Sequence, residues 1–178
     1  MMTAAREKRL SRRAARGDRS ALRSLYEEYS DQLFAVAYRL TESSADARDV
    51  VHDVFGDLPR LLRRFNGKRP RGPWLRSVTA RAALKHLRSE RRRHETTIAV
   101  AAHEGELVTS PEFPVLNSIA VERALSSLTE ELRTVVVLKE IEGCSHREIA
   151  ELLQISRSTS ESRLHRARKL LRAMLFEQ

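Results

Sequence analysis

Residues 145–172 have the sequence SHREIAELLQISRSTSESRLHRARKLLR, which predicts two helices joined by a tight turn. Ser145 is a suitable N-cap for the first helix, and Glu148, three residues later, completes a capping box. Residues 154–155 fit the turn, and Ser156 is a suitable cap for the second helix. The stretch is therefore a candidate helix-turn-helix.

The second of these helices has two chemically different faces. Its apolar side chains recur at helical spacing and are Leu164, Ala167, Leu170, Leu171 and Met174. The opposite face carries the cations Arg157, Arg163, Arg166, Arg168, Lys169 and Arg172. A helix that enters the DNA major groove needs one packed face and one basic face. An ordinary helical hairpin with a solvated basic face gives the same pattern, so the rest of the chain has to decide between them.

The composition favours a polyanionic partner. The chain has 178 residues, enough for one domain or two small ones, and 41% of them are hydrophobic, which suffices for packed cores. Its formal net charge of +9 attracts nucleic acid. No run of about 20 apolar residues predicts a membrane span, so we expect no membrane insertion.

The N-terminus and the cysteine content favour a cytoplasmic protein. Residues 1–17 are basic but lack the apolar core of a secretion signal. Their composition also suits a mitochondrial-type presequence, but the helical pattern that follows favours a basic arm. Cys144, the single cysteine, excludes an internal disulfide and is compatible with a reducing cytoplasm.

Helical periodicity divides the chain into two parts. A long amphipathic helix follows Asp18, and a second, acidic helix starts near Ala45 and meets Pro59, which should kink or divide it. We expect an all-α fold of two small helical domains joined by a linker. The expected segments are a basic N-terminal arm (residues 1–17), a helical domain (18–93), a linker (94–116) and a C-terminal helix-turn-helix domain (117–178).

The N-terminal domain contains a second basic segment. Residues 66–73, NGKRPRGP, predict a loop because they hold two glycines and two prolines. Pro73 suits the first turn of a third helix, which starts at Trp74. Over residues 60–93 the only acidic residue is Glu90, against thirteen lysines and arginines. A solvated face usually mixes its signs, so this run favours nucleic-acid binding.

The sequence has no motif of an enzyme active site. It lacks a glycine-rich phosphate loop, a G-x-S-x-G elbow and an HExxH pair. Cys144 and His146 are too few ligands for zinc, which needs three or four. The aspartates on one helix face, Asp46, Asp49, Asp53 and Asp57, can in principle ligate a divalent ion, but such a face is more often solvated or protein-binding. We expect no cofactor, no metal site and no catalytic residue.

The motifs occur in the order and spacing of one known family. They are DARDVVHDVF (46–55), PWLRSVTARAALKHLR (73–88) and, after the linker, LTEELRTVVVLKEIEGCSHREIAELLQISRSTSESRLHRARKLLR (128–172). The chain resembles bacterial RNA polymerase sigma factors of the extracytoplasmic-function (ECF) type, with its two domains similar to regions 2 and 4. The resemblance implies binding to core RNA polymerase, promoter recognition and DNA opening, without catalysis of its own. It also implies control by an anti-sigma factor.

The resemblance assigns roles residue by residue. A core-polymerase-binding face would include Asp49, His52, Asp53 and Phe55. Contacts to the −10 element would come from Lys68, Arg69, Arg71, Trp74, Arg76, Arg81, Lys85 and Arg88, around a base that the family flips out of the melted strand. Contacts to the −35 element would come from Arg157, Ser158, Thr159, Glu161, Ser162, Arg163, His165, Arg166 and Lys169.

Three positions depart from the family pattern. His52 stands where glutamine is usual and keeps a hydrogen-bonding side chain of different geometry. Arg81 stands where many members have asparagine, which strengthens phosphate attraction but alters the usual base contact. Glu161 stands where a basic residue is usual, and its carboxylate can accept from the exocyclic amine of cytosine. We therefore expect Glu161 to shift the −35 preference.

Two other functions share some of these features. A helix-turn-helix regulator that does not dock on polymerase would have the same C-terminal domain, but the acidic helix and the basic segment after it argue against this class. A small metal-dependent enzyme using the aspartates would need affinity for a divalent ion.

Overall fold

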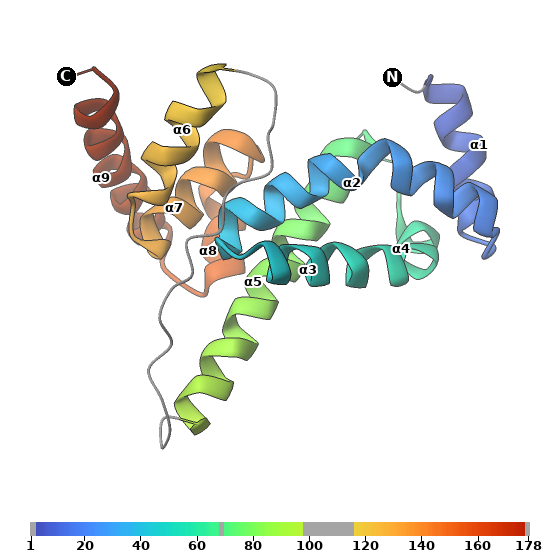
Figure 1. Cartoon of the computed structure of the whole chain (residues 1–178), viewed down its shortest axis with the longest axis horizontal. Helices are drawn as coiled ribbons and strands as arrows, with labels where there is room; N and C mark the ends of the chain where they lie inside the picture. Colours follow the sequence, from blue (N-terminus) through green and yellow to red (C-terminus); the bar gives the residue numbers. More distant parts are fainter. Residues whose placement is uncertain (1–2, 68–69, 98–115, 177–178) are drawn as a thin grey trace.

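The computed structural model describes residues 3–67, 70–97 and 116–176, and every regular element in these ranges is helical (Figure 1). The elements are α1 (Ala4–Ala14), α2 (Arg19–Thr41), α3 (Ser44–Gly56), α4 (Leu58–Arg64), α5 (Arg71–Thr97), α6 (Leu116–Ser126), α7 (Glu130–Val136), the π-helix η1 (Val137–Ile141), α8 (His146–Leu153) and α9 (Arg157–Phe176). The predicted all-α fold is confirmed.

The central helix of the N-terminal domain is α2. Asp18 caps it, since its carboxylate accepts from the Ala21 N–H at 3.1 Å. Apolar residues recur along it at three- and four-residue steps, and three of them, Leu25, Leu33 and Leu40, are at most 1% exposed. α1, α3 and α5 pack around this helix. The predicted amphipathic pattern therefore builds the core of this domain.

Pro59 divides the acidic helix, as the sequence predicts. α3 ends at Gly56 and α4 begins at Leu58, so that the proline lies in the first turn, where its missing N–H breaks no helical hydrogen bond. The apolar side chains Val50, Val51, Val54 and Leu58 are buried. The acidic side of α3 is thereby turned outward.

The basic N-terminal arm contains a helix, α1, that the sequence analysis does not predict. This helix buries Leu10 and Ala14. Its Glu7 accepts from the Tyr29 hydroxyl, and burial together with this bond raises the pKa of Tyr29. The Arg63 Nε donates to the carbonyl of Ala15 at 2.8 Å. α1 is therefore packed on the N-terminal domain.

The basic helix, α5, is longer than predicted at both ends. It begins at Arg71 rather than Trp74, with Pro73 in its first turn, and continues to Thr97. Residues 98–115 of the expected linker lie outside the described residues. Its first four residues belong to α5, and Leu116 belongs to α6.

The C-terminal domain packs at one end of α2. Figure 1 shows α6–α9 gathered at the C-terminal end of that helix, opposite α1. α6, α7 and η1 all contact α2. After η1 the chain turns at Gly143, whose φ of +68° favours glycine. The two domains therefore lie against each other, a packing that the sequence pattern does not predict.

Candidate functional site

α8 and α9 form the helix-turn-helix that the sequence predicts. In the capping box the Glu148 N–H donates to Ser145 Oγ at 3.2 Å, and the Ser145 N–H donates to the Glu148 carboxylate at 2.8 Å. α8 ends at Leu153, and Gln154, with a φ of +56°, starts the turn. Ser156 then caps α9, because its Oγ accepts from the Thr159 N–H at 3.0 Å.

A buried hydrogen bond joins these two helices. Ser160 is 0% exposed, and its hydroxyl lies 2.9 Å from Nδ1 of His146, the first residue of α8. From the sequence, His146 is a candidate only for a metal ligand beside Cys144, because a bond that spans the turn leaves no periodic signal. Among the described residues, no group of three or more His, Cys, Asp or Glu is placed to hold a metal ion.

One side of α9 is packed and the other faces solvent. Leu164 and Ala167 are buried. The exposed members of the predicted −35 set are Arg157, Ser158, Glu161, Ser162, His165, Arg166 and Lys169. Thr159 and Arg163 are half-buried, and Arg163 is paired with Glu131 of α7 at 2.8 Å. The structure thus brings most of the predicted residues together on one accessible, largely cationic side.

Arg71 and Trp74 are held against the N-terminal domain. The Arg71 guanidinium lies 5.1 Å from the centroid of the Phe65 ring and 3.8 Å from the Glu7 carboxylate. The Trp74 ring packs on the same phenylalanine, with the two centroids 4.6 Å apart. Both predicted residues are half-buried, so they help to position the start of α5.

The other predicted −10 residues divide between different sides of α5. The exposed ones are Arg81, Lys85 and Arg88. Arg76 faces the C-terminal domain instead, where its Nε donates to Glu142 at 3.2 Å. Arg88 also reaches that domain and donates to the carbonyl of Leu152 at 3.3 Å. Lys68 and Arg69 lie outside the described residues.

α3 presents the acidic face on which polymerase binding is predicted. Asp49, His52 and Asp53 are exposed. Phe55 is half-buried, and its ring centroid lies 4.8 Å from that of Tyr26 on α2. Tyr26 is 49% exposed, so an aromatic surface lies beside the acidic one. The apolar spacing of α2 does not indicate that Tyr26 is exposed.

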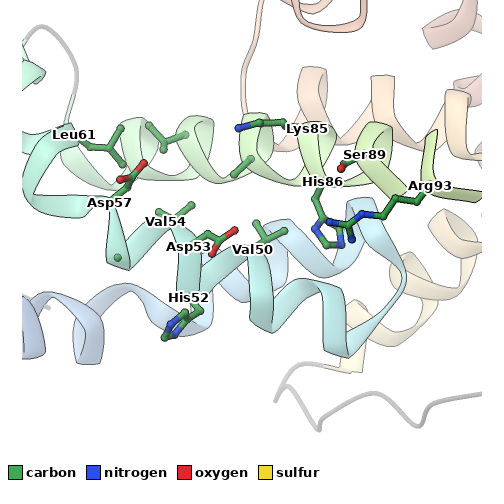
Figure 2. Close-up of a pocket in the computed structure, with 13 residues that line it drawn as sticks. Val50, His52, Asp53, Val54, Asp57, Leu61, Lys85, His86, Ser89 and Arg93 are labelled. Carbon is green, nitrogen blue, oxygen red and sulfur yellow. The ribbon is translucent and has the colours of Figure 1, made fainter. Parts of the chain in front are cut away.

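A groove lies between α3 and α5 (Figure 2). It has a volume of about 670 Å³ and is lined by apolar side chains of both helices, by Asp53 from α3 and by Lys85 from α5. Beside it, His86 Nε2 lies 3.0 Å from an Asp46 carboxylate oxygen. The expected polymerase and DNA surfaces therefore share a border.

Comparison with known proteins decides the family. The family model "Sigma-70 region 2" matches residues 25–93, and the model "Sigma-70, region 4" matches residues 118–171. The chain belongs to the sigma-70 family of RNA polymerase sigma factors. The two matched regions coincide with α2–α5 and with α6–α9, and together they cover most of this sigma factor.

Its relatives place this sigma factor in the ECF group, as predicted. The RNA polymerase sigma-H factor of Pseudomonas aeruginosa is 29% identical, over 96% of this chain and 94% of that protein. The ECF RNA polymerase sigma factor SigW of Bacillus subtilis is 26% identical, over 94% of this chain and 96% of that one. The sigma factor RpoE in its complex with the anti-sigma factor NepR, from Bartonella quintana, shares the fold, with a TM-score of 0.62 over 86% of this chain and 95% of that chain at 21% identity.

The family fixes the class of function. A sigma factor binds RNA polymerase and acts in transcription initiation as a regulatory subunit, so the predicted function is confirmed at this level. Among the described helices, none is both long and apolar enough to cross a membrane. The roles assigned to individual residues stay predictions.

Proposed function

We propose that this sigma factor docks on core RNA polymerase through the exposed face of α3, holds the −10 element with α5 and the loop before it, and recognises the −35 element with α9. The observation that carries the proposal is the accessible side of α9, supported by a capped and hydrogen-bonded helix-turn-helix. This geometry suits a recognition helix in the major groove.

The face of α3 suits a protein partner better than DNA. Its exposed carboxylates, Asp49 and Asp53, repel phosphates but attract cationic side chains. The partly exposed rings of Tyr26 and Phe55 add apolar area beside them. Aromatic residues next to charged ones are typical of protein interfaces.

The exposed side of α5 suits the DNA backbone. Arg81, Lys85 and Arg88 lie along one side of the helix, at spacings of one turn, and each is exposed. Cations arranged in this way neutralise successive phosphates and release counterions. Trp74, further toward the helix start, is fixed by packing on Phe65.

The resemblance extends to regulation by a second protein. RpoE of Bartonella quintana was solved in complex with an anti-sigma factor. We propose a partner of this class for the present chain, acting where polymerase and DNA are found, in the cytoplasm. Such a partner controls binding surfaces and adds no chemical step.

The proposal is tested by run-off transcription with purified bacterial core polymerase on genomic fragments, together with a pull-down of the polymerase. The variant Asp49→Ala/His52→Ala/Asp53→Ala should lose polymerase association by about tenfold or more, because charged contacts at the centre of an interface cost about 2 kcal/mol or more when removed. All three side chains are exposed, so the fold should be unchanged.

A matched control separates specific docking from a general effect of charge. Glu27→Ala/Asp31→Ala removes two exposed carboxylates from α2 instead of α3 and should leave association intact. If the wild-type chain binds promoter fragments but never retains core polymerase, the polymerase-docking part of the proposal is wrong, and a helix-turn-helix regulator is the better description.

A further inference from the structure

The helix of the basic N-terminal arm, α1, has no role in the proposed function. It ends before residue 25, where the match to the region 2 model begins. Residues 4–17 nevertheless hold six lysines and arginines and a single acidic residue, Glu7. A solvated helix usually mixes its signs, so this run favours an anionic partner.

α1 is fixed on the N-terminal domain. Its apolar side chains Leu10 and Ala14 are buried in the core. Just beyond its end, the carbonyl of Ala15 accepts from Arg63 Nε at 2.8 Å. The helix therefore presents one defined side to the domain and the other to solvent.

The acidic groups next to α1 are both engaged. Glu7 accepts from the Tyr29 hydroxyl and lies 3.8 Å from the Arg71 guanidinium, and its side chain is only 16% exposed. Asp18, which follows the helix, is paired with Arg13 at 2.7 Å and caps α2. The outer side of α1 is consequently cationic.

Three arginines form a stripe opposite the buried side of α1. Arg9, Arg12 and Arg16 follow one another at steps of three and four residues, which bring side chains to the same face of a helix. All three are exposed, and none forms an ion pair with another described residue. At a rise of about 1.5 Å per residue the stripe is about 10 Å long, which is about three steps of a DNA strand.

The stripe lies beside the segment that is proposed to hold the −10 element. α1 contacts α4 as well as α2, and Figure 1 shows α1 and α4 at the end of the molecule away from α6–α9. Ala15 meets Arg63 at one end of residues 63–71, and Glu7 meets Arg71 at the other. α1 therefore runs alongside the loop that precedes α5.

A nucleic-acid backbone suits this surface better than a membrane does. An amphipathic helix binds a membrane through its apolar face. In α1 that face, with Leu10 and Ala14, is packed on the domain. Exposed guanidinium groups, in contrast, are well suited to phosphate, to which they donate two hydrogen bonds at once.

We propose that the outer side of α1, with Arg9, Arg12 and Arg16, is a further DNA site that binds the phosphate backbone beside the −10 element. This rests on the proposed function, because the loop before α5 has to hold the −10 element for α1 to lie beside it. Phosphate contacts of this kind add affinity and fix position without a preference for sequence.

The salt dependence of DNA binding by the full chain tests the site. Arg9→Gln/Arg12→Gln removes two cations and keeps side chains that favour a helix. Anisotropy of a fluorescein-labelled DNA duplex should show that the slope of log affinity against log salt becomes shallower by about 1.8, since each phosphate contact contributes about 0.9. At about 0.1 M salt the affinity should fall about tenfold or more. Addition of Arg16→Gln should reduce the slope by about 0.9 more.

A matched control separates the site from a general effect of charge. Arg48→Gln/Arg123→Gln removes the same charge from exposed positions of α3 and α6, outside the proposed DNA surfaces, and should keep the wild-type slope. Circular dichroism verifies the helix content of each variant. Arg12→Gln alone, with an expected decrease of about 0.9, serves if the double variant does not fold.

A cleavage experiment locates the site on the promoter. Ala5→Cys, at an exposed position of α1, can carry a thiol-linked iron chelate, whereas the single natural cysteine, Cys144, is buried. In a promoter complex with core polymerase, hydroxyl radicals from the chelate should cut the DNA beside the −10 element. Cuts only at distant positions would show that α1 does not lie there.

The outcomes separate this inference from the proposed function. A folded test variant with the wild-type slope overturns the site, even when the wild type binds polymerase. An equal decrease in the test and control variants also overturns it, because the effect is then one of net charge. Failure of the wild type to bind polymerase overturns the docking proposal alone, since anisotropy uses the free chain.

Discussion

At the scale of single residues, Glu161 is the side chain most able to set promoter preference. It is exposed on the outer side of α9, and its carboxylate accepts from Arg157 Nε at 2.8 Å. A change at Glu161 therefore has two effects on the side that faces DNA. It replaces the carboxylate, and it releases the Arg157 guanidinium to take another orientation.

We expect Glu161→Arg to change the preferred base at its −35 position. A carboxylate accepts from the amine of cytosine, whereas a guanidinium donates to guanine, and one good base contact contributes roughly 1–3 kcal/mol, or about tenfold in relative preference. Selection from a randomised −35 library measures the change. Glu151→Arg, which has the same charge change on the exposed side of α8, should raise overall affinity without altering the preferred base. An unaltered preference in the Glu161 variant would show that the position does not recognise sequence.

The sequence predicts the exposed residues of α9 better than those of α5. On α9, the apolar spacing that contains Leu164 and Ala167 fixes which side is buried, so the outer side follows from local periodicity. On α5, the surroundings of Arg71 and Arg76 depend on Glu7 and Glu142, which are distant in sequence. No local pattern carries that information, and the predicted set therefore mixed accessible cations with partly covered ones.

At the scale of helices, capping signals were reliable and contacts across turns were not. The capping box at Ser145, the cap at Ser156 and the break at Pro59 all follow from side-chain chemistry within a few residues. The π-helix η1 and the His146–Ser160 bond depend on how helices meet. No local sequence pattern indicates either feature.

The His146–Ser160 bond should hold the helix-turn-helix together. Ser160→Ala keeps the small buried shape but leaves the imidazole nitrogen without this partner, which costs about 1 kcal/mol, or about 2–4 °C in Tm for a chain of this size. Thermal unfolding followed by circular dichroism measures the loss. Ser126→Ala, at an exposed position in α6, should leave Tm unchanged. Equal Tm values for the two variants would mean that the bond contributes nothing to stability.

At the scale of the whole molecule, the sequence predicts two domains but not the contact between them. The helical periods and the aperiodic segment after α5 mark the division, whereas pairs such as Glu42–Arg133 join residues that no motif connects. Ion pairs with one buried partner, such as Arg133 here, define an orientation more than they add free energy, because desolvation opposes their attraction. The pKa values of Glu42 and Glu142 reflect this opposition between desolvation and attraction. Burial raises both pKa values, and the arginine partner of each carboxylate acts in the opposite direction.

The raised pKa of Glu142 predicts how stability depends on pH. Its ordinary value is 4.5, burial raises it, and Arg76 and then Arg39 act in the opposite direction. A carboxyl group whose folded pKa lies above its unfolded pKa adds stability that is fully present below the unfolded value and is lost as pH rises through the folded one. Glu142→Gln removes this dependence, so the variant should melt at a higher temperature than the wild type at neutral pH, and the gap should close toward pH 4.5. Differential scanning fluorimetry across this range measures the gap, with Glu151→Gln, an exposed carboxylate paired with Arg147, as the control. A Glu142 variant that melts below the wild type at neutral pH would show that attraction to Arg76 outweighs the cost of burial.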